Sequence, residues 1–265
     1  MRRFGAIAGF LFAFAAVGLA REERDALTRA RTLYNQRQFE AAIAAAEQAR
    51  QVPARVASAD LIAARAYLEL YRERAQPEDL DRARERLRRL DPQRFGAHER
   101  VEYIVGLGET LYFDGSFGAA AGVFDSVLEG PSSLTPAEHE RVLDWWASAL
   151  DRDARPRTEF DRQAVYQRIR ERMQSELSTV PTSAAASYWI SMAARGQGDL
   201  QGAWEAVQAG WVRAPMAGDR APALRADLDR LVLTALVPER ARALGQPPET
   251  FREEWARFKS RWAPE

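Results

Sequence analysis

The stretch that decides the fold runs from Ile104 to Pro131 and reads IVGLGETLYFDGSFGAAAGVFDSVLEGP. On both sides of a central turn, apolar residues recur every three or four positions, which is the period of an amphipathic helix. Small residues at Gly108 and Ala120 allow the two helices to approach closely, and Phe124 fills the space beside them. The stretch therefore predicts two packed helices joined by a tight turn.

Weaker copies of this pattern occur at 30–49 and 190–215 and keep the spacing of the turn. Ala42, Ala120 and Ala203 occupy equivalent points in the copies and recur about 80 residues apart, which corresponds to two repeats of roughly 40 residues. One divergent helix pair therefore fits into each interval. We expect these pairs at 60–71 with 80–90, and at 136–150 with 158–178.

Two helix starts can be predicted from their capping residues. Thr135, Pro136 and Glu138 place a hydroxyl at the cap, a proline in the first helical position and a carboxylate at the reciprocal position. Thr250 and Glu253 repeat the Thr–Glu spacing before the last helix. After Ala20 the hydrophobic period is helical nearly everywhere, no alternating run of β-branched residues competes with it, and proline and glycine fall between the periodic segments. The sequence therefore predicts an all-α protein.

The segment 23–215 resembles the tetratricopeptide repeat (TPR) family, with its closest match at 104–131. No copy has the full aromatic complement of that family, and an irregular solenoid would leave a similar pattern. The resemblance implies a TPR-like α-solenoid, a right-handed superhelical stack of antiparallel helical hairpins, over 21–218. The remaining 219–265 would form a helical cap that covers the apolar end of the stack.

In this family the first helix of each pair lines a concave surface that holds peptides or partner domains. The aligned copies place a set of aromatic, arginine and other polar residues on this side, a composition that is common in binding hot spots. The predicted partner-binding groove consists of Arg31, Tyr34, Asn35, Glu109, Tyr112, Phe113, Tyr188, Met192 and Arg195.

The composition excludes several kinds of chemistry. The chain has no cysteine, and His98 and His139 are its only histidines, so thiol catalysis and a histidine-based metal centre or triad lack the residues they need. Its 38 basic and 38 acidic residues balance and are spread along the chain, which argues against a nucleic-acid partner. We therefore expect no catalytic residues, no cofactor and no metal site.

The N-terminal segment 1–20 has the layout of a secretory signal peptide. Arg2 and Arg3 precede an apolar run over Phe4–Val17, and small residues follow it up to Ala20. The run is shorter than the ~20 residues that span a bilayer comfortably, which favours cleavage. We expect an exported protein, periplasmic or secreted; an uncleaved segment would instead anchor it in the membrane.

The last helix carries Phe251, Trp255, Phe258 and Trp262 on one stripe. The simpler interpretation is that the stripe packs on the end of the stack as part of the cap. The alternative is a tethered helix that binds an acidic partner or the surface of a membrane. Peripheral membrane contact is therefore open through this helix or through the N-terminal segment.

These observations predict a non-catalytic protein–protein interaction module that binds a peptide or partner protein outside the cytoplasm, in the setting of a bacterial-type cell envelope. Two other functions remain open. The chain could be an enzyme built on a helical solenoid that acts on cell-envelope glycan, with a convergent pair of carboxylates. It could also be a structural subunit whose stack self-associates. The sequence indicates neither the partner nor the oligomeric state.

Overall fold

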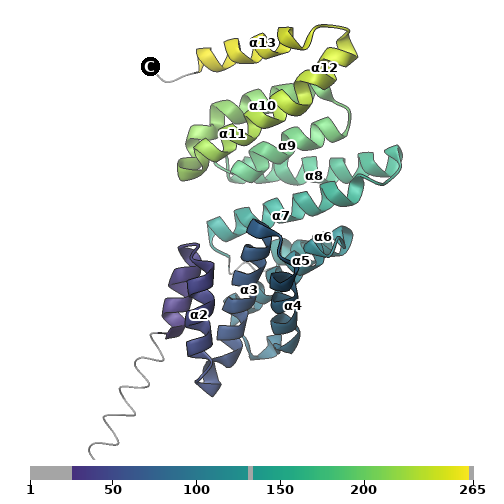
Figure 1. Ribbon diagram of the computed structural model, residues 1–265. Helices are drawn as coiled ribbons and strands as arrows, with labels where there is room; N and C mark the ends of the chain where they lie inside the picture. Colours follow the sequence, from purple (N-terminus) through teal and green to yellow (C-terminus); the bar gives the residue numbers. More distant parts are fainter. Residues whose placement is uncertain (1–25, 131–133, 263–265) are drawn as a thin grey trace, which may run out of the picture. The chain divides into compact units, whose positions relative to one another are not determined.

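The computed structural model describes residues 26–130 and 134–262. Within this part of the chain every regular element is a helix, which confirms the predicted all-α class. The chain divides into two compact units, one ending at Gly115 and the other beginning at Ser116 (Figure 1). Inside each unit, helices that follow one another in the sequence pack side by side, as in an α-solenoid. The predicted signal segment, 1–20, lies outside the described residues.

The first unit is built around α3. Helices α2 and α4 both pack against α3, and α5 packs on α3 and α4. A helix over 26–35 precedes α2. The bounds are α2 (Phe39–Ala49), α3 (Val56–Arg74), α4 (Pro77–Arg89) and α5 (Ala97–Phe113), with 3₁₀ turns at Pro53–Arg55 and Pro92–Arg94.

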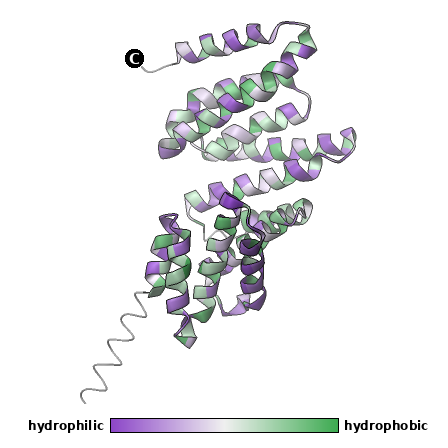
Figure 2. Ribbon diagram, viewed as in Figure 1, coloured by the Kyte–Doolittle hydropathy of each residue, from purple (hydrophilic) through white to green (hydrophobic). Residues whose placement is uncertain are grey.

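Alanines and leucines form the core of the first unit. Ala45 and Ala63 are buried where α2 meets α3 and the helix over 26–35, and their small side chains let these helices lie close together. Leu68 and Leu87 are buried in a second cluster between α3 and α4. The rest of α4 is strongly hydrophilic, so this helix has one apolar face, turned toward α3 (Figure 2).

The second unit centres on α9, which packs on α7, α8, α10 and α11. Helix α6 packs on α7 at the start of the unit, and α12 packs on α13 at its end. The bounds are α6 (Phe117–Glu129), α7 (Pro136–Ala154), α8 (Glu159–Thr179), α9 (Ala184–Gly196), α10 (Leu200–Arg213), a 3₁₀ segment (Ala214–Arg220), α11 (Ala221–Leu231), a π-helical turn (Val232–Leu236), α12 (Val237–Leu244) and α13 (Pro248–Arg261).

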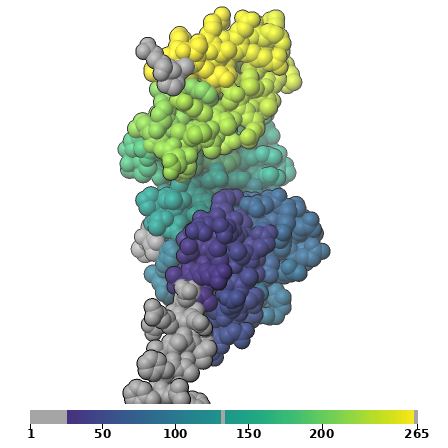
Figure 3. All heavy atoms as spheres, turned by 60° about the vertical axis from the view of Figure 1, so that its left-hand side comes forward, coloured from purple at the N-terminus to yellow at the C-terminus, as the bar shows by residue number. Residues whose placement is uncertain are grey.

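Helix α13 covers the C-terminal end of the second unit (Figure 3). Phe251, Trp255 and Phe258 are buried in one cluster with residues of α10, α11 and α12. The Trp204 ring of α10 lies edge-on to both Phe251 and Trp255. Trp262, the last aromatic of the stripe, is 52% exposed. The stripe therefore packs as a cover on this unit rather than forming a tethered helix.

The two predicted helix starts have different outcomes. The Thr135 hydroxyl accepts a hydrogen bond from the Glu138 amide at 3.3 Å, and Glu138 accepts one from the Thr135 amide at 2.8 Å, so this capping box is confirmed. The second helix begins near the predicted position, but its predicted capping box is wrong, because α13 begins at Pro248, ahead of Thr250, without a side-chain cap. Proline has the φ of the first helical turn preset, which explains the earlier start.

The segment 221–244 also differs from expectation. Proline usually marks the boundary of a helix, but at Pro238 α11 continues through the π-helical turn into α12. Proline lacks an N–H and its ring crowds the carbonyl one turn earlier, and a wide π turn directly before it relieves that crowding. Pro238 is therefore accommodated inside a continuous helical segment.

Both divergent pairs are present, as α3 with α4 and as α7 with α8. The unit boundary lies inside Ile104–Pro131, so α5 and α6, which match the repeat pattern best, belong to different units. Across the described residues, no helix combines the length and the apolarity needed to cross a bilayer.

Candidate functional site

A groove in the second unit runs over α7, α9 and α11 and holds a cavity of about 460 Å³. Each of these helices contributes residues three and four positions apart, so each presents a single stripe to the groove. We call it the Tyr188 groove. It is lined by Ala137, Glu140, Arg141, Asp144, Ala184, Ala185, Tyr188, Arg220, Ala223, Leu224 and Asp227.

Glu140 on α7 ties the walls of the groove together. Its carboxylate accepts hydrogen bonds from the Ala185 amide at 2.7 Å and from the Ser183 hydroxyl at 3.1 Å, both at the start of α9. A carboxylate is favoured there because the first amides of a helix lack partners and carry partial positive charge. Arg220, which precedes α11, lies 3.1 Å from the same oxygen. The buried Glu140 carboxylate therefore joins three segments: α7, the start of α9 and the 3₁₀ segment that precedes α11.

The middle of the groove combines aromatic rings with carboxylates. The Trp189 indole donates a hydrogen bond to Asp144 at 2.7 Å, which links α9 to α7. The Tyr188 ring packs edge-on against Trp189, with 5.4 Å between the ring centroids. Asp227 on α11 pairs with Arg230 at 3.0 Å on an exposed surface, where such a pair is weak.

Tyr188 is held in its neutral form. Burial raises the pKa of its hydroxyl, and the negative charges of Asp227 and Asp144 raise it further. The same charges make this part of the groove favourable for a cation. The groove therefore offers an aromatic ring beside carboxylates, an arrangement that suits a basic side chain.

No family model matches this sequence, and no curated protein is similar to it. The chemistry of the groove is therefore inferred from its residues. None of the residues that line it is a cysteine, serine, threonine, histidine or lysine. What it does contain, carboxylates, guanidinium groups and a tyrosine, is suited to binding.

Two of the predicted groove residues of the first unit, Tyr34 and Glu109, interact with an arginine that the sequence did not single out. The Arg65 guanidinium of α3 lies over the Tyr34 ring, 4.9 Å from its centroid, and pairs with Glu102 of α5 at 2.5 Å. Glu109 is buried and acts on the same arginine electrostatically. Arg31 pairs with Glu99 of α5. The helix over 26–35, α3 and α5 thus share one charged face.

Arg65 stays charged on this face. Burial acts to lower its pKa, but the electrostatic interactions with Tyr34 and with the carboxylate of Glu102 outweigh burial and raise the pKa above the usual arginine value. The remaining predicted residues of this unit are less involved in the face. The Phe113 ring packs on Tyr71 and on Tyr112, and Asn35 is exposed.

The structure separates the three predicted residues of α9. Tyr188 lines the Tyr188 groove. Met192 packs on the apolar cluster of α10–α13 and is partly buried. Arg195 lies in a different hollow, where Glu239 of α12 accepts two hydrogen bonds from its Nε and one from its Nη2. Of the three, only Tyr188 belongs to this candidate site.

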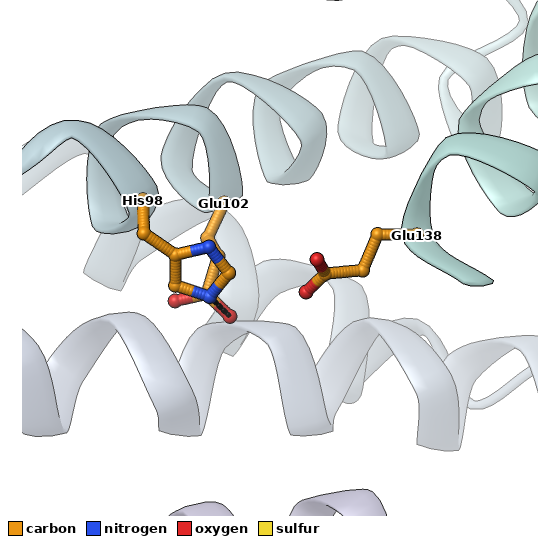
Figure 4. A group of neighbouring side chains, drawn as sticks. All are labelled: His98, Glu102 and Glu138. Carbon is orange, nitrogen blue, oxygen red and sulfur yellow. Dashed lines mark ion pairs between the residues drawn. The ribbon is translucent and has the colours of Figure 1, made fainter. Parts of the chain in front are cut away.

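Both histidines contact glutamates. His98 and Glu102 lie one turn apart on α5, with 4.0 Å between Nε2 and Oε1 (Figure 4). His139 of α7 lies 3.1 Å from Glu176 of α8. Glu138, also drawn in Figure 4, is the capping partner of Thr135. His98 is exposed, whereas His139 is partly buried and its contact joins α7 to α8.

The sequence missed most of the polar groove residues, although one signal was available. Ala137, Glu140, Arg141 and Asp144 have the spacing of a single helical stripe, and this stripe follows a secure capping box. No signal of this kind marks Arg220, since it lies in an irregular 3₁₀ segment and meets Glu140 only through tertiary packing.

Proposed function

We propose that this chain is a non-catalytic protein-binding module that acts outside the cytoplasm after removal of 1–20, and that the Tyr188 groove binds an extended peptide. The proposal includes the finer architecture: TPR-like, antiparallel hairpins in a right-handed superhelical stack. The carrying observation is that α7, α9 and α11, alternate helices in the chain, together line one groove. In helical-hairpin repeats the first helices of successive pairs form the binding surface in this way.

The charges of the groove indicate the chemistry of the peptide. Glu140 and Arg220 neutralise each other, which leaves Asp144, Asp227 and Arg141 as the other charged residues of the lining. Asp144 and Asp227 act on Tyr188, and Asp227 also pairs with Arg230 on the exposed surface. A basic side chain would find two carboxylates and an aromatic ring at this point. We infer that the bound segment presents an arginine or lysine to Tyr188.

The test is binding of fluorescently labelled extended peptides to the full mature chain, with arginine, glutamate or alanine at the central position. The arginine peptide is expected to bind best. Tyr188→Ala and Asp227→Asn should each weaken it about tenfold, the size expected for loss of one charged or aromatic contact. Asp219→Asn is the matched control, because it removes the same charge from a residue outside the groove.

Equal binding of all three peptides, or an equal loss in Asp219→Asn, would contradict the proposal. Release of soluble fragments from cell-wall glycan by the purified chain would support the enzyme alternative. A concentration-dependent ladder of masses in light scattering, without peptide binding, would support the self-associating subunit.

A further inference from the structure

A second hollow of the same unit lies where helices end, and it has a different charge pattern. Its volume is about 730 Å³, within the usual range for small-molecule sites. We call it the arginine cavity. It is lined by Asp151, Arg155, Glu159, Arg162, Gln163, Tyr166, Arg195, Gly196, Gln197, Gly198, Leu200, Glu239, Arg242 and Ala243.

Four of its charged groups are already paired. Asp151 accepts hydrogen bonds from the Tyr166 hydroxyl at 2.9 Å and from Arg155 at 2.6 Å. Glu239 binds Arg195, with 2.6 Å between Arg195 Nη2 and Glu239 Oε1, and this pairing raises the pKa of the guanidinium. These two pairs contribute no net charge to the cavity.

The other three charged groups make no side-chain hydrogen bond or ion pair with the part of the chain that the structure describes. Arg162 comes from α8 and Arg242 from α12, and Glu159 is the first residue of α8. Two guanidinium groups and one carboxylate of the lining therefore have no side-chain partner in the described part of the chain, and the lining carries a surplus positive charge. Arginine cannot lose this charge at any ordinary pH.

The part of the cavity around Arg162 is tightly packed. Gly196, at the end of α9, lies so close to the Tyr166 ring that a methyl group there would fall within 3.0 Å of it. The Gln163 side chain donates to the Gln197 carbonyl at 2.9 Å, which fastens α8 to the turn that follows α9. A fixed frame reduces the entropy lost when a ligand binds.

We propose that the arginine cavity binds the phosphate group of a small phosphate monoester, through Arg162 and Arg242. A phosphate monoester carries nearly two negative charges at neutral pH, which matches the two unpaired guanidinium groups, and their forked donors fit its oxygens. Glu159 remains available to accept a hydrogen bond from a hydroxyl elsewhere on the ligand. This site is separate from the Tyr188 groove, so it does not depend on the peptide-binding proposal.

Isothermal titration of the full mature chain with glycerol phosphate and with inorganic phosphate tests the site, at constant ionic strength set with chloride. Both probes are expected to bind. Arg162→Gln and Arg242→Gln should each weaken binding about tenfold, and the double variant should abolish it. Arg162→Lys keeps the charge but loses the fork, and should fall between wild type and Arg162→Gln.

Arg257→Gln is the matched control, because it removes one arginine from α13, outside the cavity, and should bind as wild type. Melting curves show whether the variants remain folded. Undiminished binding by the double variant, an equal loss in Arg257→Gln, or no binding of either probe by the wild type would overturn the proposal. So would binding to phosphatidic acid vesicles alone, since the recognised group would then be a membrane surface rather than a small molecule.

Discussion

The two hollows of the second unit are built from the same helices, α7 and α9, but from different parts of them. The Tyr188 groove lies along the helices, and its carboxylates surround an aromatic ring. The arginine cavity lies at helix ends, where α8 contributes Arg162 and α12 contributes Arg242. One helical framework therefore carries a site suited to cations and a site suited to anions. The two sites differ in the charges that line them: carboxylates surround Tyr188 in the groove, whereas arginines outnumber carboxylates in the arginine cavity.

The largest expected effect is loss of the framework that both hollows share. Trp255→Ala removes a buried ring that packs on Trp204 and Trp211, and should cost about 3–5 kcal/mol of unfolding free energy. Denaturant unfolding measures the loss, and peptide and phosphate binding should weaken together. Trp262→Ala is the control, because that ring is half exposed, and it should change stability little. Equal effects of the two substitutions would mean that α13 does not cover the core.

A smaller change should disturb the arginine cavity alone. Gly196→Ala places a methyl group against the Tyr166 ring, and overpacking of this kind costs about 1–3 kcal/mol. Thermal melting measures the loss, and phosphate binding should weaken while peptide binding is unchanged. Gly122→Ala on the exposed face of α6 has open space around it, and should stabilise the protein by about 0.5–1 kcal/mol. If Gly196→Ala also gains stability, the contact with Tyr166 is wrong.

Glu140→Gln should disturb the Tyr188 groove and leave the arginine cavity unchanged. Glutamine keeps an oxygen for the Ala185 amide but loses the charge that holds Arg220, so the loss should be about 1–2 kcal/mol. The released arginine would add positive charge to the Tyr188 groove, so a basic peptide should bind more weakly while phosphate binding stays the same. A parallel loss of phosphate binding would show that the two hollows are not independent.

The smallest expected effect is a dependence of the unfolding free energy on pH that comes from Tyr166. Burial, followed by the charge of Asp151, raises the pKa of Tyr166 from 10.0 to about 12. Because its folded pKa lies above the unfolded value, Tyr166 stabilises the fold below pH 10, and this contribution is lost as the pH rises toward about 12. Tyr166→Phe should therefore flatten the fall in unfolding free energy over this range. An unchanged slope would contradict the buried Tyr166–Asp151 contact.

The sequence predicted what depends on neighbouring residues and missed what depends on distant ones. The start of α7 could be read because Thr135 and Glu138 are close in the chain. Arg65 was missed because its partner, Glu102, comes from another helix of the first unit. Arg195 carried the right residue type for a binding surface, but its position follows from Glu239 on α12, which no local pattern indicates.

A charge swap across the Tyr188 groove tests the central claim most directly. Asp227→Arg in the full mature chain should bind the arginine peptide at least tenfold more weakly than wild type, by fluorescence polarisation. The same variant should bind the peptide with glutamate at the central position more tightly than wild type does, because the swapped pair restores opposite charges. If Asp227→Arg retains wild-type preference for the arginine peptide, the basic side chain does not lie at Tyr188 and the groove is not the binding site proposed.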